Sequence, residues 1–113
     1  MLSSIKRIHF IGIGGIGMSG IAELLFNQNF KITGSDLSES SNTDRLKKLD
    51  IPISIGHDRE NISSAEIVVY SDAIPKDNVE LIEANNRNIQ CYSRGQIISQ
   101  LAKLKSSTVG ISG

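Results

Sequence analysis

The sequence predicts an α/β fold, in which a parallel sheet of about five strands has helices on both of its faces. Three observations lead to this prediction. Short apolar, often β-branched runs alternate with helix-like segments five times along the chain. In the first run, 7–13, His9 is the single polar interruption after Arg7, which is typical of a strand covered on both faces. A glycine-rich turn joins this run to the first helical segment.

The individual elements follow from local signals. The predicted strands are short apolar runs bounded by turn residues, and they span 7–13, 30–35, 51–55, 66–70 and 88–92. The predicted helices show helical apolar spacing or a capping residue, and they span 15–27, 43–49, 78–86 and 93–104, with one helical turn or loop at 58–64. In the first helix, the residues expected to share the core-facing side are Ile16, Ile21, Leu24 and Leu25. A further strand is predicted to begin at Ser107.

Composition favours a single cytoplasmic domain. The chain has 113 residues, a formal net charge of +0 and no Trp, whereas nucleic-acid modules carry a basic excess and stacking aromatics. No apolar run reaches the roughly 18 residues of a membrane helix. The single cysteine, Cys91, cannot form an internal disulfide and is expected to be a buried thiol in a strand. We therefore expect no nucleic-acid partner and no membrane segment, and we expect His9 to be a core or sheet-face residue.

The glycine turn carries the strongest functional signal. Gly12, Gly14 and Gly17 fit the pattern G-x-G-x-x-G, and Asp36 ends the second predicted strand. In this Rossmann-like arrangement the glycines admit a diphosphate close to the backbone, and the acidic side chain accepts hydrogen bonds from ribose hydroxyls. Spacing alone does not identify the nucleotide, and NAD is the leading candidate on this pattern.

Other polar groups follow the carboxyl ends of other strands. His57 follows the third predicted strand, and the stretch 71–75 (Ser-Asp-Ala-Ile-Pro) follows the fourth. Ligands of open parallel sheets bind at the carboxyl ends of strands. We therefore expect these residues to share a rim with the glycine turn.

Longer stretches resemble one family. The stretch 8–23 (IHFIGIGGIGMSGIAE) is similar to the N-terminus of the Mur ligases of peptidoglycan synthesis, most specifically their L-alanine-adding branch. Further similar stretches are 34–37, 56–57 and 69–75, so the resemblance runs along the whole chain in order. It implies a domain that binds the UDP end of UDP-N-acetylmuramate, within an ATP- and Mg²⁺-dependent enzyme that forms an amide bond.

The resemblance also implies residue roles. It assigns backbone N–H groups of the glycine turn to the diphosphate, the end of the second strand to uridine, and His57 to uracil or a phosphate. The implied UDP-sugar site comprises Gly12, Gly14, Gly15, Ile16, Gly17, Met18, Ser35, Asp36, Leu37, His57, Ser71, Asp72, Ala73 and Ile74. The family often has serine where this chain has Asp72. A carboxylate facing a diphosphate is unfavourable, so we expect the Asp72 side chain to point away from the ligand or only its backbone to be used.

The same resemblance sets domain boundaries. It implies a UDP-substrate domain over 1–106 and, over 107–113, the start of a strand leading into an ATP-binding domain, with Gly113 as the first glycine of an ATP loop. The lysine and hydroxyl residue of that loop are not in the sequence, so we expect no metal, no cofactor and no catalytic residue in this chain. Its expected partners are UDP-N-acetylmuramate and the ATP-binding and C-terminal domains of a longer chain.

Two other functions remain open from the residues. A stand-alone NAD-sensing Rossmann module would show the same glycine turn and Asp36. A short-chain dehydrogenase fragment is disfavoured because the sequence has no Tyr-x-x-x-Lys pair. The continuation of the turn from Met18 to Glu23 and the Ser-Asp-Ala-Ile-Pro stretch favour the ligase domain.

Overall fold

The computed structural model describes residues 5–112 and has a five-stranded, all-parallel sheet in the order β3-β2-β1-β4-β5, which confirms the predicted fold class. The strands are β1 (Arg7–Ile11), β2 (Lys31–Asp36), β3 (Ile53–Ile55), β4 (Ile67–Tyr70) and β5 (Gln90–Ser93). The helices are α1 (Met18–Asn27), α2 (Ser41–Lys48), the 3-10 helix η2 (Arg59–Ile62), α3 (Val79–Asn86) and α4 (Arg94–Ser112).

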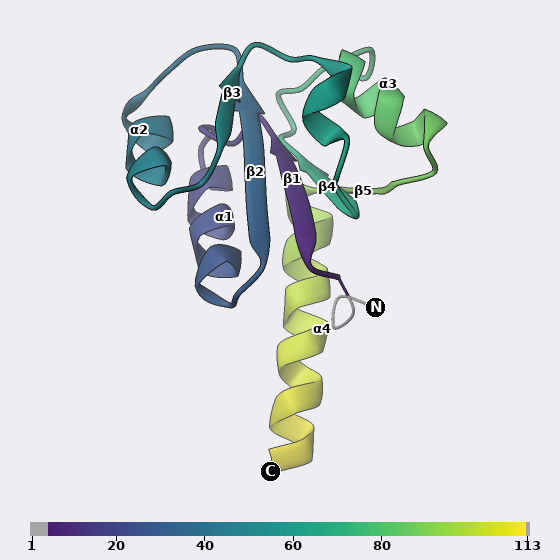
Figure 1. The fold of residues 1–113 in the computed structure, drawn as a ribbon. Helices are drawn as coiled ribbons and strands as arrows, with labels where there is room; N and C mark the ends of the chain where they lie inside the picture. Colours follow the sequence, from purple (N-terminus) through teal and green to yellow (C-terminus); the bar gives the residue numbers. More distant parts are fainter. Residues whose placement is uncertain (1–4, 113) are drawn as a thin grey trace.

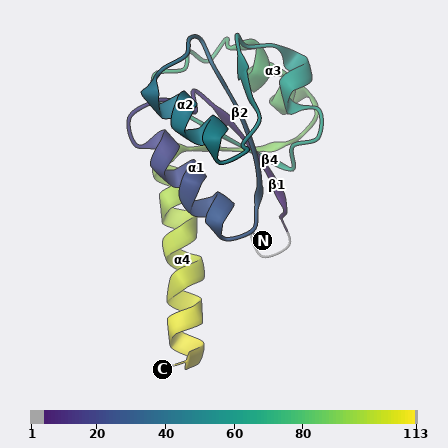
Figure 2. The same ribbon diagram turned by 60° about the vertical axis from the view of Figure 1, so that its left-hand side comes forward.

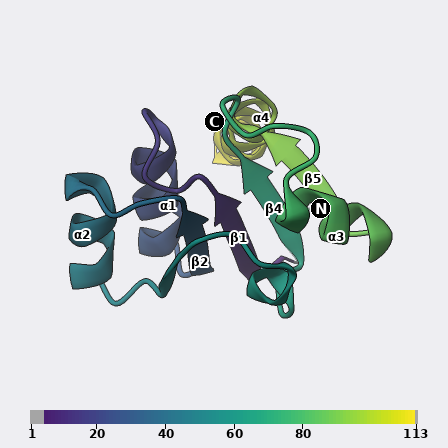
Figure 3. The same cartoon turned by 90° about the horizontal axis from the view of Figure 1, so that it is seen from above.

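The sheet separates two apolar clusters. On one face, Phe10 and Ile32 pack with Leu25 of α1, Leu46 of α2 and Ile97 of α4. On the other face, the packed residues are Ile11, Val68, Ile62, Leu81 and Ala84, from β1, β4, η2 and α3. Seen from above, α4 and α3 lie on opposite sides of the row of strands (Figure 3). This double coverage explains why β1 and β4 are almost wholly apolar.

Strand order determines where a ligand can enter. The chain goes from β1 to β2 and β3 on one side, and then crosses to β4 and β5 on the other (Figure 1). The order therefore reverses between β1 and β4, and ligands of open α/β sheets bind at the carboxyl ends of the strands beside such a reversal. The glycine turn follows β1 at this edge, and the turn 71–74 follows β4.

The prediction of a strand beginning at Ser107 is wrong, because α4 continues as a helix to Ser112 (Figures 1 and 2). A strand needs a neighbouring strand to satisfy its backbone groups, and the described sheet places none beside this segment. A helix satisfies the same groups locally, and the Ala, Leu and Lys residues at 101–105, directly before this segment, favour helix. Gly113 lies outside the described residues, and the domain boundary at residue 106 stays a prediction.

The first helix begins later than predicted. Gly17 is its N-cap with a φ of 79°, so α1 starts at Met18 and Ile16 belongs to the preceding turn. Ile16 is 95% exposed and Leu24 is 47% exposed. The prediction that these two residues face the core is therefore wrong. Ile21 and Leu25 are buried as expected.

His9 and Cys91 both lie in strands, but they differ in how far they are buried. His9 is a buried sheet residue, as predicted. Cys91 lies in β5 but is only partly buried, and burial raises the pKa of its thiol. Over residues 5–112, no helix combines the length and apolarity needed to cross a membrane.

Candidate functional site

The glycine turn is tied to the end of β2. The N–H groups of Gly12 and Ile13 both donate to the carbonyl oxygen of Ser35, at 2.8 and 3.0 Å. Gly15 N–H donates to Gly12 O at 3.0 Å. In the described part of the chain, the N–H groups of Ile16 and Gly17 donate no hydrogen bond. These two donors precede a ten-residue helix, where its dipole favours negative charge.

Asp36 binds the glycine turn directly. Its Oδ2 accepts from Gly14 N–H at 2.8 Å, and its Oδ1 accepts from Leu37 N–H at 2.8 Å. Gly14 was assigned to the diphosphate by its backbone N–H, yet in this structure that group is already paired. A Cβ at Gly14 would lie 3.0 Å from Asp36 Oδ2 and 2.9 Å from Thr43 Cγ2, so close packing also requires glycine here.

Arg94 is a further candidate site residue, which the sequence analysis did not predict. It is the first residue of α4, directly after β5, and its guanidinium lies so close to Gly17 that a methyl group there would overlap it. A guanidinium next to two unpaired N–H groups is a site suited to a phosphate. The sequence does carry one signal for Arg94, because this residue directly follows the carboxyl end of the fifth strand.

The turn after β4 packs against the glycine turn. Ser71 N–H donates to Ile11 O at 3.1 Å, and Ser71 Oγ accepts from Ala73 N–H at 3.2 Å. A Cβ at Gly12 would lie 3.1 Å from Ser71 Cβ and 3.2 Å from a methyl carbon of Ile74. The structure therefore brings the predicted residues after β1 and β4 into contact, with Asp72 exposed to solvent.

Ser35 and His57 meet around Glu80, a buried carboxylate of α3 that the sequence reasoning also missed. Ser35 is fully buried, and its Oγ lies 2.9 Å from His57 Nδ1 and 2.7 Å from Glu80 Oε1. The Ser35 side chain is thus used inside the protein, and its backbone is buried as well, with the carbonyl oxygen paired to Gly12 and Ile13 N–H. The residues next to Glu80 in the sequence do not indicate that it is buried, because its hydrogen-bond partners come from other elements.

Glu80 accepts hydrogen bonds from five groups. They are His9 Nε2 at 2.7 Å, Ser35 Oγ at 2.7 Å, Asn61 Nδ2 at 2.8 Å, Asp58 N–H at 3.0 Å and His57 Nδ1 at 3.3 Å. Burial raises the pKa of this carboxyl, but hydrogen bonds from His9, Asn61 and Ser35 outweigh burial and lower its pKa to about 2. Glu80 is therefore ionised at neutral pH.

Two apolar side chains stand exposed at the same edge. Ile16 in the glycine turn is 95% exposed, and Leu37 after β2 is 74% exposed. Ligand sites combine apolar side chains with a few polar groups, and these two residues offer apolar surface beside the donors of the glycine turn. Met18, by contrast, is fully buried, so its side chain serves the core.

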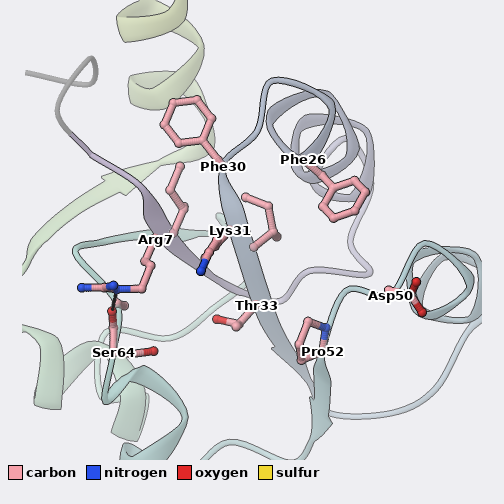
Figure 4. Close-up of a pocket in the computed structure, with 11 residues that line it drawn as sticks. Arg7, Phe26, Phe30, Lys31, Thr33, Asp50, Pro52 and Ser64 are labelled. Atoms are coloured by element: carbon pink, nitrogen blue, oxygen red, sulfur yellow. Dashed lines mark hydrogen bonds between the residues drawn. The ribbon is translucent and has the colours of Figure 1, made fainter.

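A separate cavity of about 340 Å³ lies at the amino-terminal ends of β1 and β2 (Figure 4). Phe26, Phe30 and Pro52 line it, and Arg7 at its side donates through Nε to Ser64 O at 2.8 Å. None of the predicted site residues lines this cavity. Among the described residues, no group of three or more His, Cys, Asp or Glu could hold a metal ion.

Comparisons with known proteins agree on one family. The family model "Mur ligase family, catalytic domain" matches residues 7–106. The UDP-N-acetylmuramate--L-alanine ligase of Aquifex aeolicus is 50% identical over 96% of this chain, and that of Geobacter sulfurreducens is 48% identical over 93%. This chain spans 24% and 23% of those two relatives, about a quarter of their length.

Solved structures give the same picture. The crystal structure of UDP-N-acetylmuramate-alanine ligase from Thermotoga maritima matches with a TM-score of 0.82 and 34% identity, over 86% of this chain and 23% of that one. A UDP-N-acetylmuramate:L-alanyl-gamma-D-glutamyl-meso-diaminopimelate ligase from Neisseria meningitides matches with a TM-score of 0.75 and 26% identity, over 86% of this chain and 31% of that one.

Proposed function

This chain belongs to the Mur ligase family, and we propose that its glycine turn and the neighbouring strand ends bind the UDP part of UDP-N-acetylmuramate. The relatives that match over most of this chain are named for a ligase acting on that compound and L-alanine. An NAD-sensing module has no comparable support, because the matching solved structures described above are ligases of this kind.

The observation that carries this proposal is the group of unpaired donors at the start of α1. The N–H groups of Ile16 and Gly17 are unpaired, and the Arg94 guanidinium lies beside Gly17. A diphosphate bound at this helix start would gain from hydrogen bonds, from the cation and from the helix dipole. The exposed side chains of Ile16 and Leu37 offer apolar surface to a base or sugar. Asp36 would reach a ribose hydroxyl by exchanging its bond with Gly14.

The remaining chemistry is proposed for parts of the enzyme outside these residues. The matched relatives are about four times longer than this chain, and we propose that ATP, Mg²⁺ and L-alanine bind in that additional length. We accordingly expect these 113 residues to bind UDP-N-acetylmuramate without catalysing ligation, and to do so in the cytoplasm, where a UDP-sugar is available.

Ligand titration of the 113-residue chain tests this function. We expect UDP and UDP-N-acetylmuramate to raise its unfolding temperature and NADH to leave it unchanged. A ligand at 100 times its dissociation constant stabilises the folded state by about 2.7 kcal/mol, which a thermal-shift assay detects. Stabilisation by NADH without stabilisation by either UDP compound would refute the proposal.

Arg94→Ala is expected to weaken UDP binding by roughly 10- to 100-fold, because a charge-assisted hydrogen bond to phosphate contributes about 1.5–3 kcal/mol. Isothermal titration calorimetry measures this change. Arg87→Ala is the matched control, since Arg87 pairs with Glu83 on α3 through a 2.6 Å contact. Equal affinities of both variants for UDP would exclude Arg94 from the phosphate site.

Asp72→Ser is expected to change UDP affinity by less than about tenfold. Asp72 is exposed, and its side chain has no hydrogen-bond partner in the described chain, so we expect it to lie away from the diphosphate. The same calorimetric titration measures the effect. A tightening of well over tenfold would show instead that the carboxylate repels the ligand at close range.

A further inference from the structure

One carboxylate contacts both histidines of the chain. Glu80 Oε1 lies 2.7 Å from His9 Nε2, and Oε2 lies 3.3 Å from His57 Nδ1. The side chains of Glu80, His9 and His57 are 0%, 1% and 8% exposed, so these contacts are shielded from water. An ionised carboxylate only accepts hydrogen bonds, and it therefore decides which nitrogen of each imidazole carries hydrogen.

The hydrogens of His57 can be placed by counting donors. Ser35 has one hydroxyl hydrogen, which it donates to Glu80 Oε1 at 2.7 Å. Its Oγ must then accept from His57 Nδ1 at 2.9 Å, and the contact of Nδ1 with Glu80 Oε2 requires the same hydrogen. His57 is thus the Nδ1–H tautomer, and when neutral its Nε2 carries a lone pair.

The same count gives His9 the opposite tautomer. His9 Nε2 donates to Glu80 Oε1, so in the neutral ring Nδ1 accepts from the Thr33 hydroxyl at 2.8 Å. Both nitrogens of His9 are therefore satisfied inside the protein. His57 differs, because its buried Nε2 has no hydrogen-bond partner among the described residues.

An unsatisfied buried acceptor is costly and calls for a donor. His57 lies just beyond β3 and bonds to Ser35 at the end of β2, at the edge of the sheet that holds the glycine turn. A phosphate oxygen is itself an acceptor and does not complement a lone pair. A base N–H does, and uracil joined to ribose has one such group, at N3.

We propose that Glu80 is a positioning residue for the nucleotide site, holding His57 as the Nδ1–H tautomer so that Nε2 accepts a hydrogen bond from the N–H of a uracil base. The identity of the ligand rests on the proposed UDP-binding function. The tautomer rests on the contacts of Glu80 alone. Cytosine has an acceptor at the corresponding ring position, so this arrangement favours UDP over CDP.

The ligand-free chain tests the role of Glu80. Long-range ¹H–¹⁵N correlation NMR at neutral pH distinguishes the two neutral tautomers from the imidazolium, and the chain has only two histidines to assign. We expect His9 as Nε2–H and His57 as Nδ1–H. Finding His57 as Nε2–H, or as a fast mixture of both tautomers, overturns the proposal whether or not UDP binds.

Addition of UDP tests the role of Nε2. We expect the His57 Nε2 resonance to move while remaining unprotonated, with His9 unchanged as an internal reference, and CDP to bind roughly tenfold or more weakly. Conversion of His57 to the imidazolium, or equal affinity for CDP, would place the ring against phosphate and overturn the assignment. If UDP raises the unfolding temperature but moves no His57 resonance, the base contact fails and the proposed function stands. If UDP does neither, both fail, whereas the ligand-free spectrum still decides the tautomer.

Glu80→Gln and Glu83→Gln form a matched pair on α3. Glu80→Gln is expected to abolish the single tautomer of His57 and to weaken UDP binding roughly tenfold or more. Glu83→Gln, whose parent side chain pairs with Arg87 at the surface, is expected to do neither. A folded Glu80→Gln chain that keeps both the tautomer and the affinity refutes the positioning role. If that variant does not fold, the wild-type spectra decide.

Discussion

Replacing Glu80 with alanine is expected to lower the free energy of unfolding by about 3–5 kcal/mol, the usual cost of breaking a buried charged network. Five donors from β1, β2, the loop after β3 and η2 lose their acceptor together. A domain of this size has about 5–15 kcal/mol in total. Urea unfolding followed by circular dichroism measures the loss.

The control for this experiment lies one turn further along α3. Glu83 forms an exposed pair with Arg87, and such pairs contribute at most about 0.5 kcal/mol. Glu83→Ala should therefore leave the urea midpoint nearly unchanged. Similar midpoints for the Glu80 and Glu83 variants would mean that water replaces the carboxylate in the network at little cost.

Acid stability follows from the same carboxylate. Its folded-state pKa is about 2, below the ordinary value of 4.5, so its stabilising contribution is complete above pH 4.5 and is lost as the pH falls toward 2. The shift corresponds to roughly 3 kcal/mol. The unfolding free energy of the wild type should fall steeply in this window, and that of Glu80→Gln should fall less. The pKa of Glu66 is also lowered, by backbone N–H groups of Lys6 and Arg7, so this residue adds to the slope in the same direction.

The sequence predicts best those parts of the fold that depend on residues close together in the chain. The apolar runs of β1 and β4, the glycine turn and Asp36 are local patterns, and the structure places Asp36 on the turn itself. The cap of α4 is equally local, since Ser93 and Gln96 exchange hydrogen bonds at 2.8 and 3.3 Å. Each of these features depends on residues close in the chain or on one well-defined spacing.

The parts that sequence misses depend on contacts between distant elements. Val79 and Ile82 look like core residues of α3, but they are 42% and 44% exposed, and the inward position is taken by Glu80. A buried glutamate becomes reasonable only when His9, Ser35 and the loop after β3 are known to converge on it. For Arg94 the sequence shows its position after the fifth strand, but its contact with Gly17, which lies on another element, is seen only in the structure.

Gly17→Ala is expected to reduce both stability and ligand binding. Gly17 has a φ of 79°, which costs a residue with a Cβ about 1–2 kcal/mol, and the added methyl would overlap the Arg94 guanidinium. Moving Arg94 removes the cation from the anion site, so UDP affinity should fall at least as far as in Arg94→Ala. Thermal unfolding and calorimetric titration of the same preparation measure the two effects.

Gly20→Ala is the control for Gly17→Ala, because it shows what a glycine-to-alanine change does elsewhere in α1. Gly20 lies on the exposed side of the helix, and an added Cβ there meets nothing within 4 Å, so this change should stabilise the chain by about 0.5–1 kcal/mol and leave UDP binding intact. In Gly17→Ala/Arg94→Ala the steric overlap is gone but the backbone strain remains. The double variant should therefore bind UDP no worse than Arg94→Ala while staying less stable. A further loss of affinity in the double variant would mean that the strained alanine also displaces the Gly17 N–H from the diphosphate.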